Sequence, residues 1–247
     1  MPARLASLVG LALLLGAAVL ASACTDTPAE EHREADGATE AQFASEDGAT
    51  LEARLWDRGT ERIAIYLHEF REDQSSWWSF IEQEHPAGVS ALTFDFRGHG
   101  TSEGELDDIE GMVLDAEAAV AFAREQGYRH VMLVGAGMGA AVALVTAVEV
   151  PDVTVVGFST PADFDALDTV AVVELLDDRV QLIATRDDVS AADSLHKFRA
   201  LGNIDSTQAR LYPGTEHGVD VLQGRTGTEI RVRFQELLDE FWVPPAD

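Results

Sequence analysis

Histidines, carboxylates and closely spaced glycines recur in five segments of this sequence, each directly after a short apolar run. The segments are His68-Glu69-Phe70, residues 95–104, residues 135–139, Asp187-Asp188 and Glu216-His217-Gly218. Histidines and carboxylates can transfer protons, and a glycine-rich turn lets the backbone approach another group closely. We therefore expect the chemistry of this chain in these segments.

The elements that must position these segments follow from the hydrophobic pattern. Two strands, residues 41–45 and 50–56, predict an N-terminal hairpin around the turn at Gly48. After it, buried-type strands alternate with helical patterns: strands at 62–67, 90–95, 130–135, 153–158, 180–184 and 209–212, and helices at 77–84, 112–126, 139–149, 191–200 and 228–241. This alternation predicts an α/β fold with a mostly parallel sheet of about eight strands and helices on both faces. In such sheets ligands bind at the carboxyl ends of the strands, where the five segments lie.

In this order, the segments resemble the α/β-hydrolase family, especially its small, lidless members related to dienelactone hydrolases and esterases. The resemblance covers residues 42–241, and its most specific parts are Asp95-Phe-Arg-Gly-His-Gly-Thr-Ser102 and Gly214-Thr-Glu-His-Gly218. About 20 residues separate the strands at 153–158 and 180–184, too few for a cap domain.

The resemblance also implies a set of site residues. The family presents a nucleophilic serine on a sharp G-x-S-x-G turn, followed along the chain by an acid and a histidine. Here the histidine would be His217 and the acid Asp187 or Asp188, with Asp187 preferred. The oxyanion donors would be the backbone N–H of Met138 and that of Glu69 or Phe70.

The turn departs from the family at its central position, which is Gly137 and has no hydroxyl. Loss of the nucleophile removes the covalent route. Ser159 and Thr160 follow the next strand but do not sit on the turn. We therefore interpret the chain as a catalytically impaired or inactive serine-hydrolase homologue that binds a small acyl or ester-like ligand or a partner. Two alternatives stay open: an ester hydrolase in which His217 activates water, and a surface protein with a vestigial cleft.

Glu69 stands where the family often has glycine, and a carboxylate beside an oxyanion hole would oppose the developing negative charge. We expect this side chain to point outward to solvent. We interpret His68, Asp95, Arg97 and His99 as framework residues of the site's rim and Trp77 and Trp78 as packing. Glu69, Glu72 and Asp73 lack the H-E-x-x-H spacing of a metal site, so we expect no metal and no cofactor.

The glycines allow one rival interpretation, because residues 135–140 match the dinucleotide fingerprint G-x-G-x-x-A. That fingerprint normally lies in the first strand–helix unit and is followed by an acid at the end of the next strand. Here several strands precede the glycines. The next strand ends in Gly157-Phe158-Ser159 and so has no acid at its end. The pattern therefore favours the hydrolase interpretation.

The chain carries 44 acidic against 17 basic residues, a net charge of −27, and such a surface repels phosphate backbones, so we expect no nucleic-acid partner. An uncharged segment, residues 5–23, follows Arg4 and ends in Ala21-Ser22-Ala23 before Cys24, the single cysteine. This pattern predicts a signal peptide over residues 1–23 and resembles a bacterial lipobox, with cleaved export without a lipid and an uncleaved signal anchor as alternatives. Residues 24–40 would be a lipidated Cys24 and an acidic tether, and residues 41–247 the folded domain. We expect export and a lipid anchor on the outer face of the cytoplasmic membrane.

Overall fold

The computed structural model describes residues 34–224 and 226–241. The predicted signal peptide, Cys24 and most of the predicted tether lie outside these residues. Within them, no helix is both long and apolar enough to cross a membrane.

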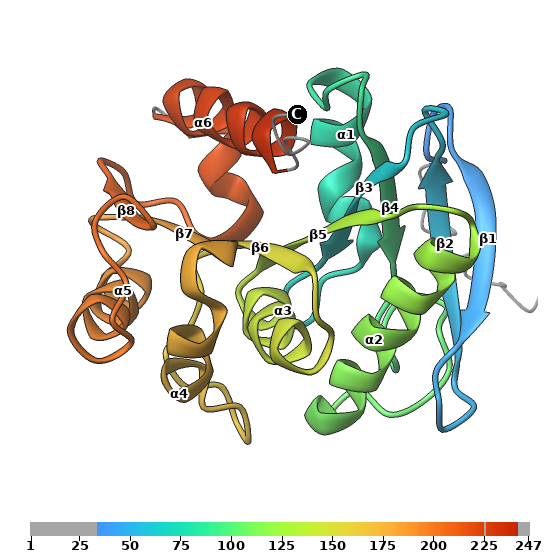
Figure 1. Ribbon diagram of the computed structural model, residues 1–247, viewed down its shortest axis with the longest axis horizontal. Coiled ribbons are helices and arrows are strands. Elements are labelled where there is room, and N and C mark those ends of the chain that lie inside the picture. The colour runs from blue at the N-terminus through green and yellow to red at the C-terminus, as the bar shows by residue number, and fades with distance from the viewer. Residues whose placement is uncertain (1–33, 225, 242–247) are drawn as a thin grey trace, which may run out of the picture. The chain divides into compact units, whose positions relative to one another are not determined.

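An eight-stranded sheet forms the centre of the domain, with the strand order β1-β2-β4-β3-β5-β6-β7-β8 (Figure 1). The β1–β2 and β2–β4 pairs are antiparallel, and the pairs from β4–β3 to β7–β8 are parallel. The strands are β1 Thr39–Ala44, β2 Thr50–Trp56, β3 Arg62–Leu67, β4 Ser90–Phe94, β5 His130–Ala136, β6 Val153–Phe158, β7 Val180–Thr185 and β8 Ala209–Tyr212. The predicted sheet is thereby confirmed.

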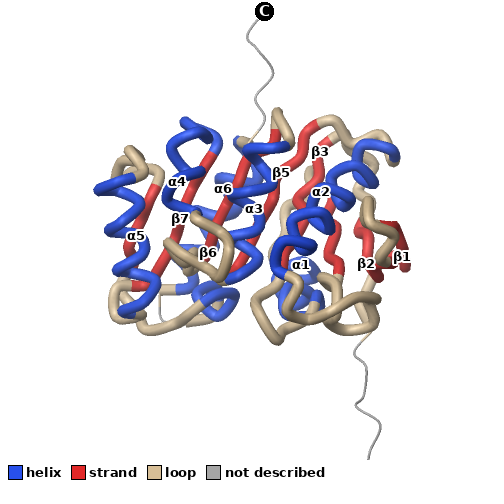
Figure 2. Tube along the Cα trace, turned by 90° about the horizontal axis from the view of Figure 1, so that it is seen from below, coloured by secondary structure: helices blue, strands red, loops and turns tan. Residues whose placement is uncertain are grey.

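Helices cover both faces of this sheet, as predicted. Helices α1 (Trp78–Gln83) and α6 (Gly227–Glu240) lie on one face. On the other face lie α2 (Ile109–Glu125), α3 (Met138–Glu149), α4 (Thr169–Val173) and α5 (Val189–Leu201) (Figure 2). Three short 3₁₀ segments complete the fold: η1 Gln74–Trp77, η2 Glu174–Arg179 and η3 Gly218–Leu222.

Two hydrophobic clusters lie on the two faces of the sheet. One contains Met112, Leu144 and Phe198 from α2, α3 and α5, and the other contains Phe80 and Phe234 from α1 and α6. Every residue of β4 is buried. The central strands β3 to β6 are largely apolar because both of their faces are covered, and burying each large side chain stabilises the fold by about 1.5–3 kcal/mol.

The folded domain begins earlier than predicted. β1 starts at Thr39, before the predicted boundary at residue 41, and the Trp56 indole N–H donates a hydrogen bond to the Asp36 carbonyl, 2.8 Å away. Between β6 and β7 the chain forms only α4 and η2. These short elements were not predicted, but the expected absence of a cap domain holds for the described residues.

Candidate active site

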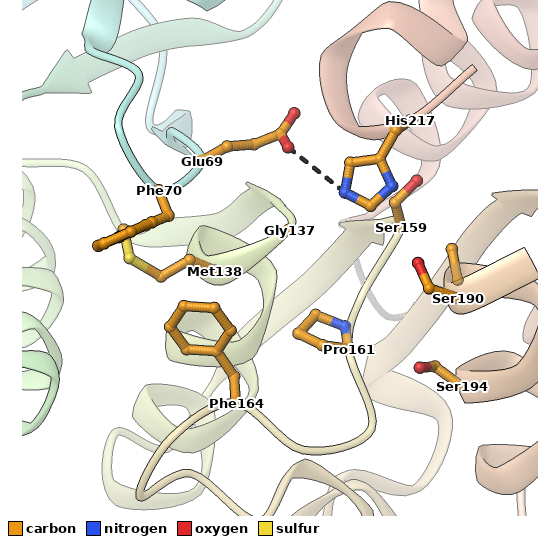
Figure 3. Close-up of a pocket in the computed structure, with 11 residues that line it drawn as sticks. Glu69, Phe70, Gly137, Met138, Ser159, Pro161, Phe164, Ser190, Ser194 and His217 are labelled. Carbon is orange, nitrogen blue, oxygen red and sulfur yellow. Dashed lines mark ion pairs between the residues drawn. The ribbon is translucent and has the colours of Figure 1, made fainter. Parts of the chain in front are cut away.

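Loops from the carboxyl ends of β3, β5 and β6, together with α5 and the loop after β8, surround a cavity of about 200 Å³ (Figure 3). Most residues named from the sequence as site residues lie here. The residues that line the cavity are Glu69, Phe70, Gly137, Met138, Ser159, Pro161, Phe164, Ser190, Ala191, Ser194 and His217.

Asp188, not Asp187, is the partner of His217. Its Oδ2 accepts a hydrogen bond from His217 Nδ1 at 2.5 Å, and its side chain is only 9% exposed. Asp188 is also the N-cap of α5, where its other oxygen accepts from the Ala191 N–H at 3.4 Å. Asp187 is exposed, and its backbone N–H donates to the Gly214 carbonyl. The preference for Asp187 was therefore wrong, because the start of α5 determines which of the two carboxylates faces the histidine.

Gly137 forms the sharp turn between β5 and α3, with φ 50° and ψ −118°. This backbone conformation is strained for a residue with a side chain. The flanking glycines are required by packing, since a Cβ on Gly135 would lie 2.4 Å from the Ala140 nitrogen and one on Gly139 would lie 2.4 Å from the Leu67 oxygen. The close approach of strand, turn and helix accounts for the glycine spacing without a bound nucleotide.

Glu69 points into the cavity, so the expectation that it faces solvent was wrong. Its Oε1 accepts a hydrogen bond from the Val219 N–H at 3.1 Å, and its Oε2 lies 3.5 Å from His217 Nε2. The side chain is 21% exposed, and burial raises the pKa of the Glu69 carboxyl, although the Val219 N–H and His217 oppose this shift. These two partners offset the cost of turning a carboxylate inward.

Two glycines leave the space that the Glu69 carboxylate fills. A Cβ on Gly137 would lie 3.1 Å from Oε2, and a Cβ on Gly218 would lie only 1.4 Å from Oε1. Both glycines also have positive φ angles. The carboxylate therefore stands directly beside the position that the family resemblance assigns to the nucleophile, on the Nε2 side of His217.

His68 holds the loop that carries Glu69. Its Nδ1 donates to the Glu69 carbonyl at 2.8 Å, and its Nε2 accepts from the Phe96 N–H at 3.0 Å. Complete burial lowers the pKa of His68 to about 3, so the ring is neutral. His68 does not line the cavity, which agrees with a framework role.

The buried Arg97 holds three segments of the fold together through ion pairs. Its guanidinium bonds Asp115 of α2 at 2.7 Å, Asp108 at the start of α2 and Asp47 of the β1–β2 turn. Burial alone would lower the pKa of Arg97, but hydrogen bonds to these carboxylates raise it above its ordinary value. Nearby, the buried Asp95 accepts from the backbone and side chain of Gln74. These residues lie in a structural network outside the cavity lining.

The contacts of Ser159, Trp77 and Trp78 indicate structural roles. Ser159 is buried and lines the cavity, but its Oγ accepts a hydrogen bond from the Gly218 N–H at 2.9 Å and it follows β6 instead of the Gly137 turn. Trp77 and Trp78 are buried in the cluster beneath α6. Among residues 34–224 and 226–241, no three His, Cys, Asp or Glu side chains are grouped so that they could hold a metal ion.

Comparisons with known proteins agree with this geometry. Residues 62–176 match the family described as serine aminopeptidase, S33. In solved structures, the chain is similar to an esterase of Pyrococcus furiosus (TM-score 0.67, 20% identity, 82% of this chain and 90% of that one). It is also similar to a lidless serine hydrolase of Xanthomonas campestris (TM-score 0.59, 17% identity, 86% and 98%).

The sheet, the strand–turn–helix at Gly137 and these similarities together show that the chain has the α/β-hydrolase fold, as the sequence motifs predicted. A curated protein that it resembles is the dihydrolipoyllysine-residue acetyltransferase component of the acetoin cleaving system of Cupriavidus necator. The two are 30% identical over 145 residues, 58% of this chain and 37% of that protein. The chain thus matches little more than a third of that relative's length.

Proposed function

We propose that this protein binds a small ligand in the cavity at Gly137 and does not hydrolyse esters by the serine mechanism of its fold. The observation that carries this proposal is the Glu69 carboxylate, which stands beside Gly137 and faces His217 Nε2. In an active serine hydrolase that nitrogen accepts the proton of the nucleophile. Here no hydroxyl is present at residue 137, and a carboxylate faces the base instead.

The charge of Glu69 adds to the loss of the hydroxyl. In a serine protease without its nucleophile, the remaining binding and oxyanion contributions still accelerate hydrolysis by about 10³–10⁴-fold over the reaction in water. A negative charge about 4 Å from a developing oxyanion would further destabilise it by about 4 kcal/mol at the effective dielectric constant of a protein surface. The cavity is therefore poorly suited to a tetrahedral, oxyanionic transition state.

Hydrolysis by a water that His217 activates is disfavoured by the same contact. Asp188 can only accept, so His217 Nδ1 carries a hydrogen. Nε2 is then the nitrogen left to accept a proton from water, and Glu69 Oε2 lies 3.5 Å from it. The carboxylate therefore stands where an attacking water would have to contact its base.

Turnover of p-nitrophenyl acetate tests the proposal. We expect the native protein, His217→Ala and the control His196→Ala, which changes an exposed histidine of α5, to hydrolyse the ester at one common background rate. A native rate well above background that His217→Ala abolishes and His196→Ala preserves would contradict the proposal and establish the water mechanism.

We also propose that the chain is exported and anchored through Cys24, since its single cysteine follows the small residues Ala21-Ser22-Ala23. Expression in a bacterial host with radiolabelled palmitate should label the native protein and place it in the membrane fraction. Cys24→Ser should lose the label. An unlabelled native protein in the soluble fraction would contradict the anchor, and an unlabelled one in the membrane would indicate an uncleaved signal segment instead.

A further inference from the structure

We propose that the ligand of this cavity is a small organic cation, an ammonium group on a short apolar body, held by the carboxylate of Glu69. This inference rests on the proposed binding function and names the chemical class of its ligand. It reverses the polarity expected of a hydrolase site, which is built to stabilise negative charge.

The charged groups at the cavity are mainly negative. Two carboxylates, Glu69 and Asp188, converge on His217, and even with one proton shared among the three groups a net negative charge remains. Glu72 and Asp220 add to the negative potential at Glu69. None of the residues that line the cavity is Lys or Arg. The guanidinium of Arg71 lies against the Phe70 ring, 5.4 Å from its centroid, but Arg71 does not line the cavity.

The side of the cavity opposite Glu69 is apolar and aromatic. Phe70, Met138 and Phe164 gather there, on the side of the cavity away from the Glu69–His217 pair (Figure 3). The Phe70 and Phe164 rings lie 6.3 Å apart, centroid to centroid, and are inclined by 62°. Aromatic rings attract cations through their electron-rich faces and also cover apolar groups. A carboxylate opposite an aromatic wall is thus complementary to an ammonium group with a short apolar body.

The carboxylate is also fixed in place before any ligand binds. The Val219 N–H holds Oε1, and the space left by Gly137 and Gly218 admits the carboxylate in this position. His68 fixes the backbone of the same residue by donating to the Glu69 carbonyl. Preorganisation of this kind lowers the cost of ordering groups on binding. An anionic ligand would meet the same fixed charge as repulsion.

Three probes of nearly equal shape test the proposal: benzylammonium, benzyl alcohol and benzoate, titrated into the native protein by calorimetry. We expect benzylammonium to bind about tenfold or more tightly than either of the others, as one charge-assisted hydrogen bond provides. Glu69→Gln should remove this preference. The matched control Glu125→Gln changes an exposed carboxylate of α2 and should keep it, which separates a local site from attraction by the overall charge of −27.

The result that would overturn the proposal is equal affinity for the three probes, tighter binding of benzoate, or a preference that survives Glu69→Gln. If that variant fails to fold, the native protein decides the question, because benzylammonium must shift the imidazole NMR signals of His217 and benzoate must not. Ester hydrolysis measured on the same samples keeps the two proposals distinct. An inert protein without cation preference loses only this inference, whereas a hydrolytically active protein loses the proposed function.

Discussion

At the scale of single residues, the site is determined by three positions that depend on one another. Glu69 can turn inward because Gly218 lacks a side chain and Gly137 leaves room beside the carboxylate, and Val219 and His217 then provide its partners. A serine at residue 137 would place its Cβ about 3.1 Å from Glu69 Oε2. Its hydroxyl would have Glu69 as an immediate acceptor in competition with His217, so restoring the serine alone should not restore the triad.

Neither the orientation of Glu69 nor the choice of Asp188 could be predicted from the sequence. Both depend on contacts between segments far apart in the chain: Glu69 meets Val219, and Asp188 meets His217. The motifs predicted which segments converge, because the carboxyl ends of parallel strands share one edge of the sheet. They could not predict which of two adjacent side chains faces inward, because that depends on the exact residue at which α5 begins.

At the scale of elements, aspartates fix the starts of the helices around the site. The side chains of Asp108, Asp168 and Asp188 accept backbone N–H groups at the first turns of α2, α4 and α5. A carboxylate there compensates both unpaired N–H groups and the positive end of the helix dipole. Asp188 does this while it orients His217, so one side chain connects the position of α5 to the site.

The Arg97 network gives a stability prediction at this scale. Asp115→Ala would leave the guanidinium of Arg97, which is 3% exposed, without the carboxylate that lies deepest in the fold. We expect the free energy of unfolding in urea to fall by about 3–5 kcal/mol, as when one partner of a buried ion pair is removed.

The matched control is Glu61→Ala, which breaks the exposed pair between Glu61 and Arg129 and should cost less than about 1 kcal/mol. Equal losses for the two variants would mean that the Arg97 network does not hold the β1–β2 turn, the β4 loop and α2 together.

At the scale of the whole molecule, the eight strands and the longer helices were predicted because their sequences are strongly periodic or continuously apolar. The elements that lie outside the predicted ranges, α4, η2 and η3, are 5, 6 and 5 residues long. Segments of this length carry too few residues for a helical period to show. β1 starts before the predicted boundary because pairing with β2, Thr39 opposite Leu55, holds a polar stretch in place, and sequence polarity alone does not reveal such pairing.

The α/β-hydrolase fold extends over 82% of this chain in the comparison with the Pyrococcus furiosus esterase, yet the proposed loss of serine chemistry depends on one carboxylate beside one glycine. The most direct measurement is covalent labelling by a fluorophosphonate, read by intact mass and peptide mapping. We predict no adduct on the native protein, little or none on Gly137→Ser, and a stoichiometric adduct at position 137 of the double variant Gly137→Ser/Glu69→Gly. A stoichiometric adduct on the native protein, or full labelling of Gly137→Ser with Glu69 still present, would contradict the account.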